Sequence, residues 1–311
     1  MKLYFAPLEG ITTYIYRNAH FESFAGCDYY YAPFINPSDQ EKVSKKGMRD
    51  IFPENNPHIP LKIQVLTNNS DSFLKFEERA IELGYDEINL NIGCPAGTVV
   101  KKGRGAGFLR NTDELDAFFD RIFSSAKAKV SVKTRIGYHS PDEMEALMDI
   151  FNKYPMSLLI IHPRTRDELY GGNVHMDIFK KAYEKARMPL CYNGDIVTKE
   201  DYEKIALRFP ELDGIMLGRG AIQNPAIFRE INGGSSLSCK ELFAFSEKLM
   251  KIYRETYTTD TFALHKMKEQ WIFMIKNFPE EKKTEKAIRK AKTLQELAFA
   301  VNELLLKAEN C

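Results

Sequence analysis

The sequence of 311 residues lacks several features that would place it in a common class of protein. Its five cysteines are odd in number and widely spaced, with no CxxC pair, so we expect no structural zinc, no other metal and no disulfide framework. No stretch approaches the ~20 consecutive apolar residues of a membrane span, and no charged leader precedes an apolar run at the start. Neither a P-loop nor a dinucleotide-binding fingerprint occurs. These absences predict a cytoplasmic protein.

The composition is that of an ordinary soluble globular protein, with 44% apolar and 28% charged residues. The length suits a barrel of roughly 230–250 residues followed by a small second domain. The net charge of +1 hides an asymmetry, because residues 1–234 carry 30 Lys and Arg against 32 Asp and Glu, whereas residues 235–311 carry 14 against 11. A mildly basic tail fits an anionic partner, although solvated helix faces explain it equally well.

Eight short apolar runs recur before residue 221, rich in Ile, Leu, Val and Tyr, as is typical of strands buried on both faces. Helical patterns separate most of them, for example 70–84 and 112–126. This alternation predicts an α/β fold, a parallel (β/α)8 TIM barrel, in which the polar stretch 35–59 carries only a short helix and a long loop. The expected strands are 2–8, 28–34, 60–66, 87–93, 129–136, 157–164, 189–196 and 214–220.

Small residues at 233–236 indicate a linker, after which only helices are expected, over 239–257, 263–278 and 293–309. We therefore predict a barrel domain, 1–234, and a small all-α helical domain, 235–311. Helix starts are predicted where polar residues have capping spacing. These starts are Ser140 with Glu143 and Pro141 at the first helical position, Thr198, and Ser238 with Glu241.

Polar and glycine residues gather at seven of the eight expected strand ends. Because the active site of a β/α barrel lies at the carboxyl ends of its strands, they predict one convergent site. They are Pro7, Leu8 and Glu9 after the first strand, Gln64 on the third, Asn91 and Cys94 at the fourth, Lys133 and Arg135 on the fifth, His162 and Arg164 on the sixth, Asn193, Gly194 and Asp195 at the seventh, and Gly218 and Arg219 at the eighth.

The seventh and eighth strand ends predict a phosphate site. Gly194, Gly218 and Gly220 let backbone N–H groups approach a ligand closely, and Arg219 adds positive charge. Either glycine turn alone fits plain turn geometry. Together, at the place where barrels often hold a phosphate, they favour a cofactor of mononucleotide size.

Lys133 and Cys94 are the candidate reactive groups at the mouth of the predicted barrel, the end where the carboxyl ends of the strands meet. A buried lysine is costly unless it meets an anion or reacts, so Lys133 could stabilise a reduced flavin or form a Schiff base. Cys94 precedes a basic, glycine-rich loop whose charges could lower the thiol pKa or bind phosphates. Most single cysteines are apolar filler, which is the role we expect of the other four. The loop's basic residues are Lys101, Lys102 and Arg104.

The sequence resembles the tRNA-dihydrouridine synthase family, motif by motif and in family order, over most of residues 1–230. The cysteine-loop motif is the most specific of the set. The motifs are APLEGIT (6–12), NIGCPAGTVVKKGRGAGFL (91–109), VKTRIG (132–137), HPRTR (162–166), NGDI (193–196) and LGRGAIQNPAIF (217–228).

The resemblance implies a barrel that holds FMN, takes electrons from a transient NADPH or NADH, and reduces uridines in tRNA, with Cys94 as the proton donor. The helical tail corresponds in position to the family's tRNA-binding domain. The implied flavin contacts are Pro7, Leu8, Glu9, Gln64, Lys133 and His162, with Asn193, Gly194, Asp195, Gly218 and Arg219 at the ribityl phosphate end. Asn91, Lys101, Lys102, Arg104, Arg164 and Arg166 are the implied substrate contacts.

Three alternatives to this function stay open. A flavin barrel could act on a small pyrimidine or an enone, although such a substrate needs neither a basic loop nor a helical tail. A Schiff-base aldolase could use Lys133. A catalytically silent barrel could simply bind tRNA. We expect no stable protein partner and therefore a monomer.

Overall fold

The computed structural model describes residues 1–24, 26–37, 45–257 and 259–308. Its centre is a closed barrel of eight strands in sequence order, each parallel to its neighbours, with β1 pairing to β8. The predicted (β/α)8 barrel is therefore confirmed, and each strand overlaps its expected apolar run, with β5 and β6 each extending one residue beyond it. The strands are β1 (Lys2–Phe5), β2 (Tyr29–Tyr31), β3 (Leu61–Val65), β4 (Glu87–Ile92), β5 (Lys129–Gly137), β6 (Leu159–Thr165), β7 (Leu190–Tyr192) and β8 (Gly214–Leu217).

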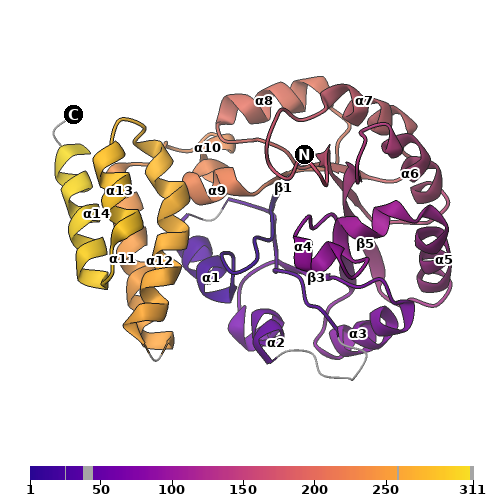
Figure 1. Cartoon of the computed structure of the whole chain (residues 1–311), viewed down its shortest axis with the longest axis horizontal. Coiled ribbons are helices and arrows are strands. Elements are labelled where there is room, and N and C mark those ends of the chain that lie inside the picture. Colours follow the sequence, from indigo (N-terminus) through magenta and orange to yellow (C-terminus); the bar gives the residue numbers. More distant parts are fainter. Residues whose placement is uncertain (25, 38–44, 258, 309–311) are drawn as a thin grey trace.

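Helices surround the barrel, and a separate group of helices stands at one side of it (Figure 1). The helices around the barrel are α1 (Tyr14–Ser23), α2 (Lys45–Ile51), α3 (Ser70–Glu82), α4 (Gly97–Val100), α5 (Thr112–Phe123), α6 (Glu143–Phe151), α7 (Met176–Lys185), α8 (Lys199–Arg208), α9 (Arg219–Gln223) and α10 (Ile227–Ile231), with 3-10 turns η1 (Pro53–Asn55) and η2 (Gly105–Arg110). The side group, here called the helical bundle, comprises α11 (Cys239–Thr256), α12 (Asp260–Met274), η3 (Ile275–Asn277), α13 (Lys282–Lys290) and α14 (Leu294–Ala308).

The helix starts agree with the sequence at two of three places. Complete capping boxes begin α8 at Thr198 and α11 at Ser238. At α6 the helix begins at Glu143, not at Pro141, and no side chain caps it. The Glu143 carboxylate does accept from the Ser140 N–H at 2.8 Å, but it also accepts from the two preceding N–H groups. It therefore closes a loop over residues 138–140 instead of a capping box.

Helix α13 was not predicted, because its sequence is dominated by Lys, Arg and Glu. Thr284 and Ile288, one turn apart, are its buried side chains, and the helix packs against α12 and α14. Packing against α12 and α14 thus stabilises a helix that the composition of its sequence only weakly predicts. In the 35–59 stretch the expected short helix is α2, although residues 38–44 of that stretch lie outside the described residues, as does residue 309 of the last expected helix.

The interior of the barrel has an apolar half and a polar half. The apolar half comes from strands β6 to β8, β1 and β2, and it includes Ile160, Cys191 and Met216, all fully buried. The polar half comes from β3, β4 and β5. Its buried side chains are Gln64, Asn89, Asn91 and Ser131. Amides inside a protein are tolerated only where they are hydrogen-bonded, so the polar half must carry a satisfied network.

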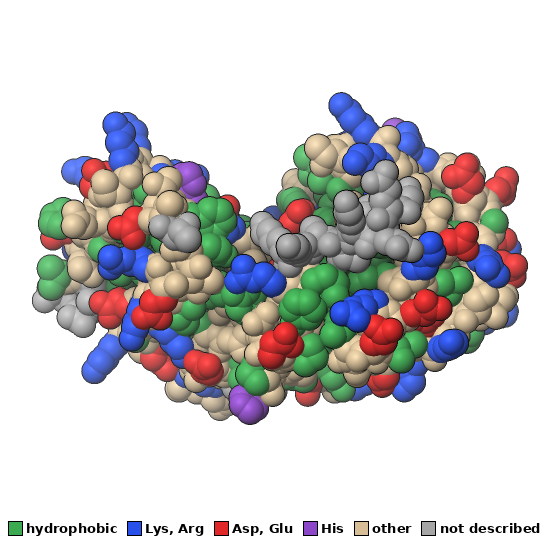
Figure 2. Space-filling view, turned by 90° about the horizontal axis from the view of Figure 1, so that it is seen from below, with side chains coloured by type: hydrophobic (Ala, Val, Ile, Leu, Met, Phe, Trp, Pro, Cys, Tyr) green, Lys and Arg blue, Asp and Glu red, His purple; other side chains and the backbone are tan. Residues whose placement is uncertain are grey.

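The helical bundle packs on the barrel through α11, which contacts α1, and α12, which contacts α9. Trp271 of α12 is fully buried and donates its indole N–H to Ser246 of α11 at 2.9 Å. Figure 2 shows a hollow between the bundle and the barrel on one side of the molecule. None of the helices in the described part of the chain is long and apolar enough to cross a membrane.

Candidate active site

A hydrogen-bonded chain of side chains crosses the polar half of the barrel. Asn89 Nδ2 donates to Ser131 Oγ at 3.0 Å, and Gln64 Nε2 donates to Asn89 Oδ1 at 2.7 Å. Asn91 Nδ2 then donates to Gln64 Oε1 at 2.8 Å. The Asn91 oxygen accepts from the backbone N–H of Gly93 at 3.0 Å and of Cys94 at 2.9 Å. The network therefore orients the turn that carries Cys94.

The Cys94 turn is held by close backbone packing that only glycine permits. At Gly105, φ is +55°, and a Cβ would lie 2.7 Å from the backbone oxygen of Cys94. The Cys94 oxygen accepts from the Ala106 N–H at 3.0 Å. Arg104 ties the same loop to its neighbours, donating to Asn68 Oδ1 at 3.2 Å and to Asn36 Oδ1 at 2.6 Å. The glycines of this loop are thus needed for its geometry.

The Cys94 thiol is partly buried, and its pKa is raised by that burial. The Glu9 carboxylate also raises the pKa, while Arg135 and Lys133 lower it. The sequence suggested that Lys101, Lys102 and Arg104 either lower this pKa or bind phosphates. The first alternative is wrong, because the pKa is raised, Lys101 and Lys102 are exposed and Arg104 is engaged with two asparagines, whereas the second stays a prediction. The thiol therefore keeps its proton at neutral pH, which suits an acid better than a nucleophile.

Lys133 lies opposite Asn91 in the β4–β5 register, on the strand next to the Cys94 turn. Burial, together with the nearby Arg135, lowers its amine pKa to about 8, so most of the amine is still protonated at pH 7. Its amine makes no hydrogen bond or ion pair to the described residues. It is thus a cation held ready for a group that the protein itself does not supply.

His162, on β6, is buried and electrically neutral. Its pKa lies well below the ordinary value because of burial and because Arg135, Lys133 and Arg164 surround it. Arg164 Nη1 lies 3.3 Å from His162 Nε2. A guanidinium can only donate, so Nε2 is the accepting nitrogen and the proton sits on Nδ1. His162 therefore presents a donor from its other ring nitrogen.

Arg164 and Arg219 grip one carboxylate, that of Asp195 beyond β7. Arg164 binds both of its oxygens, with Nη1 at 3.0 Å from Oδ1, and Arg219 Nη2 lies 2.7 Å from the same Oδ1. This lowers the pKa of Asp195. Arg164 is only 1% exposed and also donates to the backbone oxygens of Gly171 and Gly172. Its expected contact with substrate does not fit this burial, because all of its donors are used inside the protein.

The backbone around the expected phosphate site is tight. Asn193 Nδ2 donates to the Met216 oxygen at 2.8 Å, joining the ends of β7 and β8. A Cβ on Gly194 would collide with Tyr192. Gly218 caps α9, and a Cβ there would meet Ala6 and Leu8 at ordinary contact distance. Arg219, half-exposed, keeps guanidinium donors beyond its contact with Asp195.

The remaining expected contacts lie at the rim. Pro7 and Leu8 are partly buried after β1, and Glu9 is exposed. Lys101 and Lys102 are exposed in the turn that follows α4. Arg166 is half-buried, with Nη1 3.0 Å from Asp167 and its guanidinium 5.4 Å from the Tyr138 ring centre. These residues surround the mouth without contacting the polar chain.

Arg135 and Tyr170 belong to the same mouth and were not assigned a role from the sequence. Arg135 is 1% exposed and donates to the backbone oxygens of Gly93 at 2.9 Å, Thr165 at 2.8 Å and Leu169 at 2.6 Å. Tyr170 is 54% exposed, with Arg135 and Arg219 over its ring. The sequence had placed Arg135 with Lys133 at the fifth strand end of the predicted site, without giving it a role. No sequence signal indicated Tyr170.

A mouth of this kind, at the carboxyl ends of closed parallel strands, is where β/α-barrel enzymes carry their active sites, and it places the chain in that class. The family model described as dihydrouridine synthase matches residues 4–310. The chain belongs to the dihydrouridine synthase family.

Individual relatives agree with the family match. A probable tRNA-dihydrouridine synthase of Staphylococcus aureus (strain MRSA252) is 29% identical over 245 residues, covering 76% of this chain and 73% of the relative. The tRNA-dihydrouridine synthase B of Pasteurella multocida (strain Pm70) is 28% identical over 229 residues, covering 73% and 68%.

Solved structures share the fold at much lower identity. Morphinone reductase superposes with a TM-score of 0.54 at 10% identity, covering 76% of this chain and 87% of its own. Histamine dehydrogenase from Rhizobium sp. 4-9 gives 0.57 at 12%, covering 75% and 45%. These two likenesses concern the barrel fold alone.

Proposed function

We propose that this protein reduces the C5–C6 double bond of specific uridines in tRNA to dihydrouridine, with FMN as its cofactor and NADPH or NADH as a transient donor. Family membership over residues 4–310 carries the proposal. The site supports it with a protonated cysteine fixed beside a lysine and a neutral histidine at one barrel mouth.

Cys94 is the proposed proton donor. Its raised pKa keeps the thiol protonated, and the Asn91 oxygen fixes the backbone of its turn. A positioned acid typically contributes ~10²–10⁴ in rate. Asn91 Nδ2 donates one of its two hydrogens to Gln64, so we propose that Asn91 both fixes the turn of Cys94 and offers its second amide hydrogen to the uracil.

The residues at the mouth fit a flavin mononucleotide. Lys133 offers a cation without a protein partner, and His162 offers the Nδ1 donor, both suited to the carbonyl side of an electron-poor ring. Arg219 and the glycine-lined ends of β7 and β8 suit a phosphate. When bound, the flavin supplies hydride to carbon-6 of the uracil, while Cys94 protonates carbon-5.

Each proposed flavin contact then has its own role in holding the cofactor. Pro7, Leu8 and Glu9 line the edge after β1. Gln64 is fully buried and acts through its remaining amide hydrogen or by holding Asn91. Asp195 orients Arg219 by their 2.7 Å contact. The phosphate end is assigned to Asn193, Gly194, Asp195, Gly218 and Arg219.

The tRNA is proposed to contact both parts of the chain, the barrel domain (1–234) and the helical domain (235–311). The target base must leave its stack, at a cost of a few kcal/mol, and backbone contacts offset that cost. Lys101, Lys102 and Arg166 are proposed to make such contacts, and Arg104 shapes the loop that carries the two lysines. A monomer located in the cytoplasm remains our expectation.

The decisive experiment maps dihydrouridine in tRNA from cells that lack this gene. We expect dihydrouridine to be missing at one or more positions and to return when the gene is restored. A complete set of dihydrouridines in the deletion strain, with no activity of the purified protein on its unmodified tRNA, would refute the proposal. The purified protein should be yellow, and its flavin should bleach with NADPH or NADH.

One specific observation favours a second candidate. The Lys133 pKa of about 8 would also suit an amine nucleophile, as a Schiff-base aldolase requires. A colourless protein that borohydride traps covalently on a carbonyl substrate at Lys133 would support that reading. A yellow protein that is not trapped would exclude it.

A further inference from the structure

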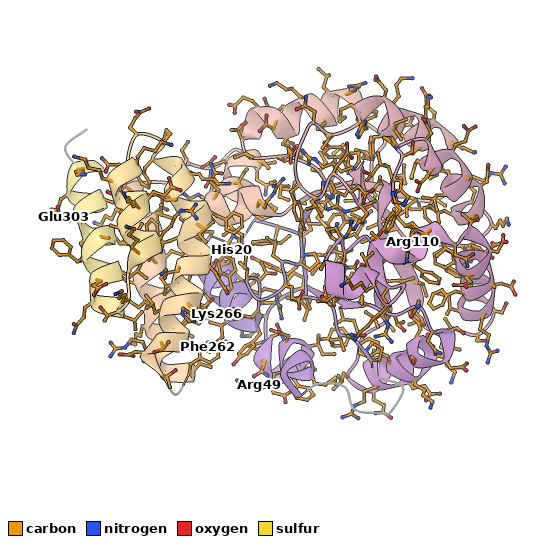
Figure 3. The ribbon with its side chains drawn as sticks, viewed as in Figure 1. His20, Arg49, Arg110, Phe262, Lys266 and Glu303 are labelled. Carbon is orange, nitrogen blue, oxygen red and sulfur yellow. The ribbon has the colours of Figure 1, made fainter. Side chains whose placement is uncertain are left out.

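Lys266 of α12 is a buried charge at the junction between the helical bundle and the barrel. The residue is 7% exposed. Its amine donates to the backbone oxygen of Gly10 at 2.7 Å and lies 2.6 Å from a carboxylate oxygen of Glu269. In Figure 3, Lys266 lies on the side of α12 that faces the barrel, and so does Phe262, one turn earlier. Burying a lysine is costly, so its two partners define where it must sit.

The segment that Lys266 grips is the tight turn after β1. Gly10 has φ of +76°, which favours glycine. Within the turn, the N–H groups of Ile11 and Thr12 both donate to the Leu8 oxygen at 3.0 Å. The turn is therefore compact, so a shift of the backbone at Gly10 would also move Leu8 at the start of the turn.

A second residue of α12 holds the same turn. Gln270 is fully buried, and its amide donates to the Ile11 oxygen at 3.4 Å and to the Tyr253 hydroxyl at 3.4 Å. The bundle thus grips two consecutive carbonyl groups of the turn from residues one helical turn apart.

This turn forms one edge of the active-site mouth. The turn follows β1 at the carboxyl end of the barrel, the same end as the Cys94 turn after β4, because all eight strands are parallel. Its Leu8 side chain lies beside Gly218 at the end of β8, where a Cβ would meet it at 3.7 Å. The Cys94 turn is fixed by the polar chain inside the barrel and the β1 turn from outside by α12.

We propose that Lys266 is a positioning residue for uridine reduction. It fixes the position of the β1 turn relative to the barrel. That position sets where Pro7–Glu9 lie, and these residues align the flavin and the target base with Cys94. The inference rests on the proposed function. It makes the helical bundle a structural part of the active site as well as a surface for RNA.

The test compares Lys266→Met with Lys268→Met in the full-length, flavin-loaded protein. Lys268 is a matched control on the same helix, because its amine also donates to a backbone oxygen, that of Ala291 at 2.9 Å, but inside the bundle. The measurements are the single-turnover rate of uridine reduction at saturating tRNA, the Kd for tRNA and the melting temperature.

We expect Lys266→Met to lower the saturated single-turnover rate ~10-fold, since small misplacements of reacting groups have effects of at least this order. The Kd for tRNA should change less than about 3-fold. Lys268→Met should leave the rate unchanged, whatever it does to the melting temperature. Lys266→Arg should recover most of the rate, because a guanidinium can still donate to the Gly10 oxygen.

Equal rates in Lys266→Met and Lys268→Met would overturn the inference, as would a loss confined to tRNA affinity. If Lys266→Met fails to fold, Lys266→Gln replaces it, because a shorter polar side chain cannot reach both partners. The inference then requires the same loss of rate in Lys266→Gln. A wild-type protein that forms no dihydrouridine would instead refute the proposed function, so the two failures are distinct.

Discussion

The two halves of the barrel interior solve the same packing problem with opposite chemistry. Ile160, Cys191 and Met216 fill the apolar half with side chains that need only volume. Gln64, Asn89 and Asn91 fill the polar half with amides that must each find a partner, and they do so in one chain that ends at the Cys94 turn. The apolar half therefore supplies stability, whereas the polar half supplies position. Substitutions in the two halves should separate these contributions.

The largest expected effect on activity comes from the end of the polar chain. Cys94→Ala should retain flavin and its reduction by NADPH or NADH, yet lower dihydrouridine formation by ~10²–10⁴, because the acid is lost. Rapid-mixing absorbance follows the flavin, and nucleoside analysis of tRNA follows the product. Wild-type yields of dihydrouridine from this variant would remove Cys94 from the mechanism.

The largest expected effect on stability comes from the apolar half. Ile160→Ala should lower the free energy of unfolding by about 2–5 kcal/mol, because it opens a cavity at a fully buried site. At temperatures where the variant stays folded, its rate per active site should remain near that of the wild type. Denaturant unfolding measures the loss of stability, and nucleoside analysis of tRNA measures the rate. A selective loss of rate would show that the apolar half also sets position.

Asn91→Leu should show the reverse pattern. It conserves volume but leaves the Gln64 oxygen and the Gly93 and Cys94 N–H groups without their partner, at a cost of about 1–3 kcal/mol for each group that stays buried. For a comparable loss of stability, the rate of uridine reduction should fall by a larger factor than in Ile160→Ala. Identical ratios of rate loss to stability loss in the two variants would end the distinction between the halves.

The smallest expected effect concerns Lys133 in the flavin-free protein. Its folded pKa of about 8 lies below the ordinary 10.5, so the charged amine destabilises the fold. This penalty is complete below about pH 8. It fades toward pH 10.5, where the folded state has lost a proton that the unfolded state still holds. Lys133→Met should therefore raise the free energy of unfolding by at most ~3 kcal/mol at pH 7 and by less at pH 10.

Denaturant unfolding of both proteins at the two pH values measures this difference. A gain from Lys133→Met that is the same at both pH values would show that the lysine pays no burial penalty. The same variant should reduce turnover in the flavin-loaded enzyme, where unchanged turnover would argue against its assigned contact.

The sequence was sufficient to predict the barrel, because each strand coincides with a local apolar run. It was also sufficient to predict which residues lie at the mouth, because the predicted strands define their own carboxyl ends. It could not show that Gln64 and Asn89 continue the chain that begins at Asn91, since those contacts join different strands. Nor could it show that Arg164 is buried on Asp195, or that the Cys94 pKa rises, because both depend on what surrounds a residue in space. Helix α13 was missed for the same reason.

The position of Arg135 has a consequence for how sequences of this kind can change. One guanidinium binds three carbonyl groups in two segments that lie far apart in the chain, Gly93 after β4, and Thr165 and Leu169 at the end of β6 and just beyond it. An insertion or deletion in either segment would shift a carbonyl away from the shared cation and disturb the contacts to the other. The two segments should therefore keep a constant length together, or change together once Arg135 is replaced.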